Sequence, residues 1–142
     1  GAIAEVFPPS HTFPIKLEKK VSDRLPPLMM QRAHLREIMV NLMVNAREVT
    51  REGGNVAISC SPSANYEIEM RIKDSGGGIP VEQREQIFEP YFTTKKKGTG
   101  LGLAIVKQNT ELYGGEIRVE SELGESTEFI LTFPTRVLSR DN

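Results

Sequence analysis

The feature that most constrains this fold is a run of apolar residues at helical spacing between about residues 31 and 50. Its members recur every three or four positions: Leu35, Ile38, Met39, Leu42, Met43, Ala46 and Val49. An apolar stripe with this period is typical of a helix that buries one side against another layer. Gly53-Gly54 predicts the end of that helix. The rest of the chain must therefore supply a layer that covers the stripe.

Segments with strand character lie on both sides of this helix. Phe13, Ile15 and Leu17 alternate with polar residues, which predicts a strand within residues 13–21. Further strands are expected at 55–61, 66–73, 116–122 and 127–133, a second long helix at 100–113, and a short helical stretch near 81–87. Because helices are interleaved with mostly antiparallel strands, we predict an α+β fold. Its expected form is a two-layer α/β sandwich with a mixed, mostly antiparallel sheet packed on three helices.

Length and charge narrow the class of protein. The 142 residues suit one domain, which we divide into a linker or leader at 1–12, a folded domain at 13–136 and a C-terminal tail at 137–142. With 18 Lys and Arg against 19 Asp and Glu, no basic excess exists to neutralise phosphates, so we expect no nucleic-acid partner. No stretch approaches the ~18 apolar residues that a membrane helix needs, so no direct membrane contact is expected. The single Cys60 excludes an internal disulfide and a multi-cysteine zinc site.

Two amide side chains interrupt the first helix. Asn41 and Asn45 are four residues apart and therefore lie on the same side, at the edge of the apolar stripe. An amide oxygen in a cleft there could be a ligand for Mg²⁺, which takes few protein oxygens together with phosphates and waters. The alternative is a pair of solvated asparagines.

A glycine-rich segment, DSGGGIP at residues 74–80, directly follows a strand. Consecutive glycines let the backbone approach a flat ligand closely. The carboxylate of Asp74 could accept a hydrogen bond from an exocyclic amine, which would favour adenine over guanine. A plain turn is the alternative, because Asp and Gly are ordinary turn residues.

A second glycine-rich segment, GTGLGL at residues 98–103, opens the second long helix. Backbone N–H groups at a helix N-terminus bind anions well. The segment lacks the Lys of a P-loop and the position after a first strand that a Rossmann fingerprint needs, so it would be a phosphate site of another kind. Lys95, Lys96 and Lys97 precede it and could reach phosphates, or could simply be a solvated charge run.

In this order, four segments resemble the N, G1, F and G2 boxes of the catalytic ATP-binding domain of sensor histidine kinases, in the gyrase–Hsp90–histidine kinase–MutL superfamily. They are NLMVNA at 41–46, DSGGGI at 74–79, IFEPYFTTK at 87–95 and GTGLGL at 98–103. The likeness spans about residues 13–134 and closes with segments at 113–117 and 124–129 that are similar to the last glycine motif. It implies a Bergerat-type sandwich with ATP beneath a lid at residues 80–97.

The resemblance also implies roles for individual residues. Asn45 would coordinate Mg²⁺, and Asn41, the implied catalytic residue, would lie near the phosphates. Asp74 would bind the adenine amine directly and through a water shared with Thr127. The other implied nucleotide-binding residues are Gly76, Gly78, Ile79, Lys95, Gly98, Thr99, Gly100, Leu101, Gly102 and Leu103. The aromatic residues Phe88, Tyr91 and Phe92 would anchor the lid, with simple core packing as the alternative.

Some positions depart from the family pattern. Ser75 stands where Asn is common, Gly77 where Pro is common, and Ser126 where Gly is usual. We expect the extra glycine at 77 to loosen its loop. Asn41 stands where ATPases of the superfamily carry a Glu that activates water, so fast free hydrolysis is not expected.

A phosphoacceptor histidine, followed by Glu and later by Asn-Pro, is missing: neither His11 nor His34 has this context. The chain begins with Gly1 rather than Met, so we expect a piece of a larger protein. The expected function is that of a monomeric, cytoplasmic catalytic domain of a protein-histidine kinase. It would use ATP and Mg²⁺ to phosphorylate a His on a separate dimerisation/phosphoacceptor domain of the same kinase, with a response-regulator receiver domain downstream. The alternative is a nucleotide-binding conformational switch or interaction module without phosphotransfer.

Overall fold

A computed structural model describes residues 15–50, 53–64, 66–92 and 100–135. The elements, in chain order, are strand β1 (Lys16–Val21), helix α2 (Arg32–Val49), strands β2 (Asn55–Ser63) and β3 (Glu67–Asp74), the short 3₁₀ turns η1 (Val81–Gln83) and η2 (Gln86–Phe88), helix α3 (Gly102–Leu112), and strands β4 (Glu116–Glu122) and β5 (Ser126–Pro134). The helical stretch expected near residues 81–87 is thus two three-residue turns. Their backbone hydrogen bonds join residues three apart, as in the bond from Gln83 N to Pro80 O, because each turn is too short for an α-helix.

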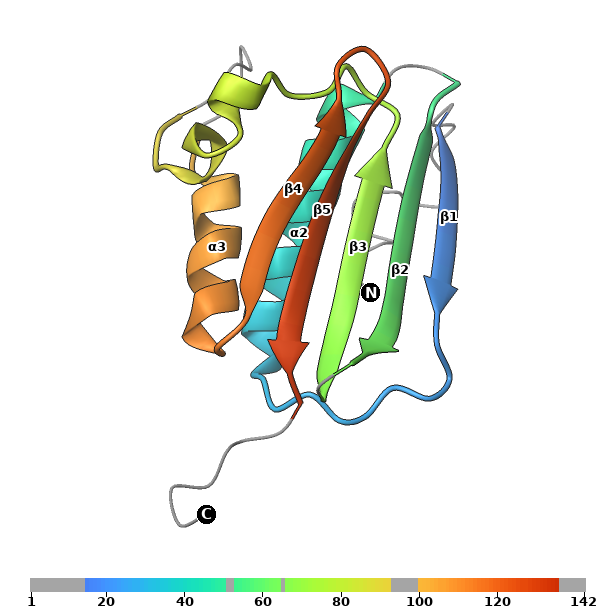
Figure 1. The fold of residues 1–142 in the computed structure, drawn as a ribbon, viewed down its shortest axis with the longest axis vertical. Helices are drawn as coiled ribbons and strands as arrows, with labels where there is room; N and C mark the ends of the chain where they lie inside the picture. The colour runs from blue at the N-terminus through green and yellow to red at the C-terminus, as the bar shows by residue number, and fades with distance from the viewer. Residues whose placement is uncertain (1–14, 51–52, 65, 93–99, 136–142) are drawn as a thin grey trace.

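The five strands form one mixed sheet in the order β1-β2-β3-β5-β4 (Figure 1). Only β1 and β2 are parallel, and α2 makes the crossover between them. The other neighbours are antiparallel, so the predicted mixed, mostly antiparallel sheet is confirmed. Strand β2 runs past its expected end and includes Pro62. The pairing with β1 stops at Cys60, so the missing N–H of Pro62 faces no partner strand.

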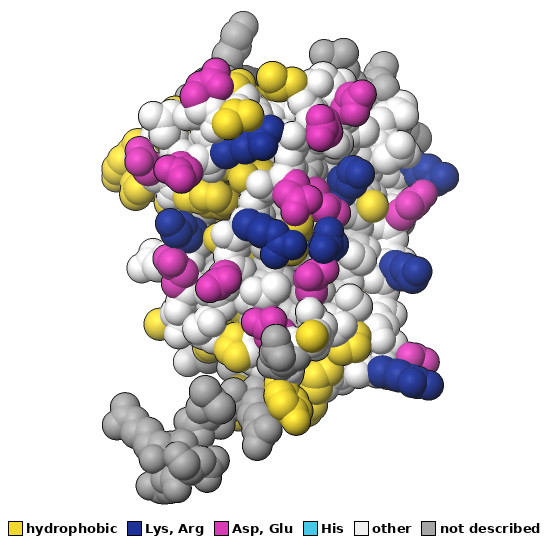
Figure 2. Space-filling model, viewed as in Figure 1, with side chains coloured by type: hydrophobic (Ala, Val, Ile, Leu, Met, Phe, Trp, Pro, Cys, Tyr) yellow, Lys and Arg dark blue, Asp and Glu magenta, His cyan; other side chains and the backbone are white. Residues whose placement is uncertain are grey.

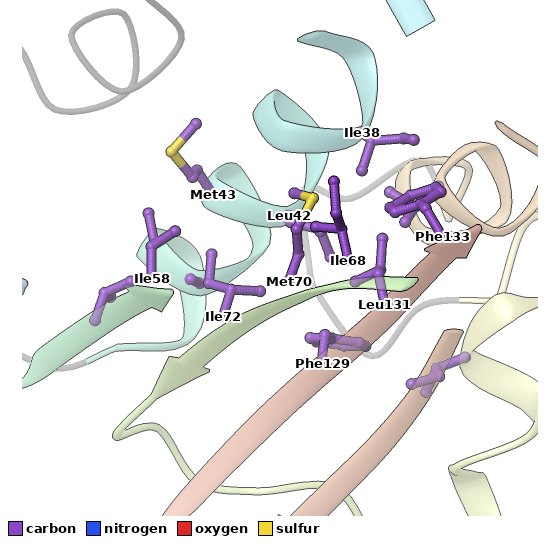
Figure 3. Close-up of a cluster of buried hydrophobic side chains, with 14 residues drawn as sticks. Ile38, Leu42, Met43, Ile58, Ile68, Met70, Ile72, Phe129, Leu131 and Phe133 are labelled. Carbon is purple, nitrogen blue, oxygen red and sulfur yellow. The ribbon is translucent and has the colours of Figure 1, made fainter. Parts of the chain in front are cut away.

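The hydrophobic core lies between the sheet and the helices. Figure 1 shows α2 running behind the sheet and α3 beside the β4 edge. Ile38, Leu42 and Met43 of α2 point at side chains from the strands (Figure 3). Those strand residues are Ile58, Ile68, Met70, Ile72, Phe129, Leu131 and Phe133. The predicted apolar stripe therefore does face the sheet, and the two-layer sandwich is the fold.

The face of the sheet without helices carries charged side chains of both signs (Figure 2). Near its centre Arg71 forms ion pairs with Glu69 and Glu128. The hydrogen bond to Glu69, and then the charges of Glu69 and Glu128, raise the pKa of Arg71 above its usual value. Ile130 is 1% exposed although it is on this face, and Arg71 and Arg118 are its cross-strand neighbours. Their aliphatic stems can cover it while the charged groups stay in water.

Candidate nucleotide-binding site

The predicted site residues come together at one end of the sandwich. The last residue of β3, the turn between β4 and β5, the C-terminal end of α2 and the N-terminal end of α3 all lie at the upper end in Figure 1. Segments that are far apart in the chain thus share one edge of the core. Among the described residues, no helix is long and apolar enough to span a membrane.

Three polar side chains form the last row of the sheet at this end. Asp74 on β3 is the cross-strand neighbour of Thr127 on β5, and Thr127 is the neighbour of Ser121 on β4. Side chains alternate along a strand, so this row shares the core face with the adjacent pair of Ile72 and Phe129. Asp74 and Thr127 are each only 3% exposed. A carboxylate and a hydroxyl are therefore buried side by side where the apolar core ends.

The loop after Asp74 is confined between α2 and the β4–β5 turn. The Gly76 N–H donates a hydrogen bond of 2.9 Å to Oδ1 of Asp74. A Cβ on Gly76 would lie 2.6 Å from the carbonyl oxygen of Val49, in the last turn of α2. Gly78 has φ +78°, and a Cβ there would lie 2.6 Å from the carbonyl oxygen of Glu122. Both approaches need glycine.

Hydrogen bonds hold the same loop on both sides of Gly77, the position expected to loosen it. The Gly124 N–H donates to the Gly77 carbonyl at 2.8 Å. Before it, the Asn55 N–H donates to Oγ of Ser75, and the Ser75 N–H donates to the Asn55 carbonyl. After it, the Ile79 N–H donates to a side-chain hydroxyl of β4. Gly77 itself would tolerate a Cβ, since nothing lies within 4 Å.

The two asparagines of α2 lie between the glycine-rich segments. The Asn41 amide nitrogen donates to the Glu37 carbonyl at 2.8 Å. A Cβ on Gly102, the first residue of α3, would lie 3.0 Å from Oδ1 of Asn41. The amide oxygen of Asn41 is therefore the atom that meets the start of α3. Asn45 follows one turn later and is half-buried.

Contacts along α2 thus occur in a fixed order. Gly102 meets Asn41, Asn45 follows one turn on, and Gly76 meets Val49 after a further turn. Eight residues of α-helix separate the first and last of these contacts, which is about 12 Å. The two glycine-rich segments therefore both meet the C-terminal half of α2, one near its middle and one at its last residue, with Asn45 midway between the two contacts.

The second glycine-rich segment meets the residues before it at Gly100. The Tyr91 N–H donates to the Gly100 carbonyl at 2.8 Å. Gly100 has φ +75°, and a Cβ there would lie 2.4 Å from the carbonyl carbon of Tyr91, whose own φ is +68°. Leu101 is the N-cap of α3 and provides no side-chain cap, so the first N–H groups of this helix are not capped from that side chain. The predicted site residues Lys95, Gly98 and Thr99 lie outside the described residues.

Several predicted residues have their side chains in the core. Phe88 packs edge-on against Phe129, with ring centroids 6.1 Å apart. Phe92, Ile79 and Leu103 are partly buried and also pack against the core. For Phe88 and Phe92 the core-packing alternative is confirmed. Tyr91 differs, since it is 76% exposed.

Sequence reasoning missed residues that hold the site in place. Ser121 is the third member of the polar row. The sequence could have predicted that it faces the core, because it continues the alternation of Ile117 and Val119 along β4. The buried Asn109 of α3 donates to Oε1 of Glu37 at 2.9 Å, one turn from Asn41. No local pattern predicts that contact, which joins residues from two separate helices.

His34 does not face the site: Nδ1 of its ring is hydrogen-bonded to the hydroxyl of Tyr113. The two rings are 5.5 Å apart and tilted, which ties the start of α2 to the end of α3. His34 is therefore a structural residue, and His11 lies outside the described residues.

Comparison with known proteins identifies the family. Residues 30–137 match the family described as histidine kinase-, DNA gyrase B-, and HSP90-like ATPase, so the chain belongs to this family. Its fold and sequence are those of the ATP-binding catalytic domain of sensor histidine kinases, as the resemblance implied.

Individual relatives make the assignment more specific. The chain is 36% identical over 127 residues to the sensor histidine kinase ZraS of Escherichia coli (strain K12), which covers 89% of this chain and 27% of ZraS. It is 34% identical over 122 residues to sporulation kinase E of Bacillus subtilis (strain 168), covering 86% of this chain and 16% of that kinase. The chain therefore spans about a quarter or less of the length of these curated relatives.

Solved structures of histidine kinases have the same fold. The catalytic domain of histidine kinase ThkA is 30% identical, with a TM-score of 0.77, covering 94% of this chain and 82% of that one. Full-length ShkA in complex with AMPPNP is 33% identical, with a TM-score of 0.81, covering 93% of this chain and 28% of ShkA. The predicted sandwich is thereby confirmed.

Proposed function

We propose that this domain binds ATP with Mg²⁺ and donates the γ-phosphate to a histidine on a separate dimerisation/phosphoacceptor domain of the same kinase. A response-regulator receiver domain would then accept the phosphate in a two-component signalling pathway. We further propose that the isolated domain is monomeric and works in the cytoplasm, where ATP is available. One observation carries the proposal: the order of the contacts along α2.

That order matches the order of groups in ATP. At the Val49 end of α2, the buried carboxylate of Asp74 offers an acceptor for the adenine amine. At Asn41, near the middle of α2, the start of α3 offers backbone N–H groups and a favourable dipole for the phosphates. The separation of about 12 Å along the helix leaves room for the ribose and α-phosphate between them.

The residues present fit Mg²⁺. Mg²⁺ prefers hard oxygen ligands and keeps waters and phosphate oxygens in its shell. Asn45 lies on α2 midway between the Asn41 and Val49 contacts, and the amide oxygen of Asn41 faces the start of α3. Within the described part of the chain, no group of three or more His, Cys, Asp or Glu side chains could hold a metal ion. We infer that Asn45 holds Mg²⁺ together with the nucleotide, where the ion would neutralise phosphate charge.

Asn41 then has a role that suits transfer to a protein rather than to water. Its amide nitrogen already donates to the Glu37 carbonyl, which holds the side chain in place. An amide cannot take a proton from water, so it cannot act as a general base for hydrolysis. We infer that Asn41 positions the terminal phosphate and that free hydrolysis stays slow.

Calorimetry with an Asp74→Asn variant tests the adenine assignment. A charged hydrogen bond contributes about 1.5–3 kcal/mol, so ATP affinity should fall roughly 10- to 100-fold. Asp23→Asn is the matched control, because Asp23 is exposed and lies between β1 and α2. Unchanged ATP binding by Asp74→Asn would refute the assignment.

Phosphotransfer needs a separate test. The chain is mixed with the phosphoacceptor domain of its parent kinase and with ATP labelled at the γ-phosphate. We expect an acid-labile label on the acceptor histidine that requires Mg²⁺. Tight ATP binding without any transfer would instead favour a nucleotide-dependent conformational switch.

A further inference from the structure

A hydroxyl that no motif predicts connects three parts of the site. Oγ of Ser121 accepts a hydrogen bond from the Ile79 N–H at 2.8 Å. The same oxygen donates to the Ser126 carbonyl at 2.8 Å. It also lies 3.2 Å from Oγ1 of Thr127, the hydroxyl buried next to Asp74. Ser121 thus joins the loop after β3 to the strand that carries Thr127.

The number of hydroxyl protons decides which group donates in each hydrogen bond of this network. A serine hydroxyl has one proton and two lone pairs. Ser121 donates its proton to the Ser126 carbonyl, so its lone pairs are left for the Ile79 N–H and for Thr127. Thr127 must therefore be the donor in the contact between the two hydroxyls. With its own proton committed to Ser121, Thr127 offers only lone pairs toward the Asp74 side.

The geometry points to Ser121 as a positioning residue that determines base selectivity. By fixing the Thr127 proton, Ser121 makes the buried end of the site present acceptors only, from the Asp74 carboxylate and from the Thr127 hydroxyl. At the position of the amine, such a site selects a purine that carries the amine over one that lacks it, because a purine without the amine would leave buried acceptors unpaired. This inference rests on the proposed binding of ATP at Asp74.

Arg84 holds Ser121 in place from the outside. Its Nη2 donates to the Ser121 carbonyl at 2.7 Å, and its Nε donates to the Ile79 carbonyl at 3.3 Å. One planar guanidinium thus spans the two backbone segments that the Ser121 hydroxyl also joins. Arg84 keeps these segments at the spacing that the Ser121 hydroxyl needs.

The test compares ATP with purine riboside triphosphate, which lacks the amine but keeps N1 as an acceptor, by calorimetric titration of the whole chain. In Ser121→Ala the Thr127 proton is released and can turn toward the base. The dissociation constant for the analogue divided by that for ATP should then fall about fivefold, which is the effect of one hydrogen bond. Ser121→Thr keeps a hydroxyl and should restore the ratio. Ser59→Ala, on β2 and on the helix-free face, is the matched control and should leave it unchanged.

The outcomes separate this inference from the proposed function. If the unmodified chain does not bind ATP, the proposed function fails and the inference fails with it. If the chain prefers ATP but Ser121→Ala keeps the same ratio, or weakens both nucleotides equally, the positioning role is overturned while ATP binding stands. If Ser121→Ala does not fold, Arg84→Met decides: a reduced ratio supports the inference, and an unchanged ratio overturns it.

Discussion

Replacing Gly78 with alanine tests how closely the loop after β3 is confined. Gly78 has φ +78°, and a Cβ would lie 2.6 Å from the Glu122 carbonyl oxygen and 2.9 Å from Cα of Leu123. Both are backbone atoms, so no side-chain rotation can relieve the contact. Two other glycines serve as controls. Gly124 has φ +80° but an added Cβ would meet nothing within 4 Å, and Gly77 has no positive φ and likewise leaves an added Cβ free of contacts within 4 Å.

These three environments predict three different changes in the free energy of unfolding. A non-glycine residue in the left-handed region costs roughly 1–2 kcal/mol. Overpacking against a fixed neighbour typically adds about 1–3 kcal/mol. Gly78→Ala should therefore lower the free energy of unfolding by about 2–5 kcal/mol, and Gly124→Ala by about 1–2 kcal/mol. Gly77→Ala should leave it unchanged or raise it by about 0.4–1 kcal/mol, because alanine restricts the unfolded chain.

Urea unfolding followed by circular dichroism measures all three variants, and ATP titration of the folded proteins adds a second measurement. We expect Gly78→Ala to lose both stability and ATP affinity, while Gly77→Ala keeps both. Equal stability of Gly78→Ala and Gly124→Ala would show that the β4–β5 turn does not press on the loop. If Gly77→Ala were the most damaging of the three, the reasoning from close approach would be refuted.

Two further predictions concern single residues. Gly100→Ala places a Cβ 2.4 Å from the carbonyl carbon of Tyr91 at φ +75°, so the free energy of unfolding should fall by about 2–5 kcal/mol. Thermal unfolding with and without ATP measures this loss, and ATP should raise the melting temperature of the variant less than that of the unmodified chain. An unchanged melting curve would contradict this prediction. Burial raises the pKa of the Cys60 thiol, so at pH ~8 this thiol should react with a disulfide reagent more slowly in the folded chain than in the urea-unfolded chain. Its contribution to stability should decline as the pH rises through the pKa of the unfolded thiol. Equal reaction rates in the folded and unfolded chains would refute this prediction.

Local patterns determined the elements of this fold. The stripe on α2 predicted which residues would be buried, and Ile38, Leu42 and Ala46 are at most 2% exposed. This succeeds because the helical period alone decides which side chains share a side. Alternation likewise predicted the strands, and Asp74 was expected at a strand end, where it lies. The boundaries shifted by a few residues where pairing with a neighbour strand decides them.

Contacts between distant segments could not be predicted in this way. Ser121 reaches Ile79 across 42 positions of the chain, and Arg84 reaches Ser121 across 37. Those hydrogen bonds depend on the register of β4 and β5 and on the path of the loop above them. Neither the register nor the path is encoded in residues near Ser121 itself. The hydroxyl is therefore visible in the sequence as a strand residue and only in the fold as part of the site.

The three adjacent glycines at 76–78 show most clearly what the sequence determines and what only the tertiary structure decides. The family resemblance marked Gly77 as a departure, but the residues themselves predict only a loop that can approach a ligand closely and do not say what each glycine contacts. In the folded chain Gly76 is pressed against the Val49 carbonyl and Gly78 against the Glu122 carbonyl, whereas Gly77 faces open space. The need for glycine comes from backbone atoms that α2 and the β4–β5 turn bring to the loop, so only the tertiary structure decides which of the three is replaceable.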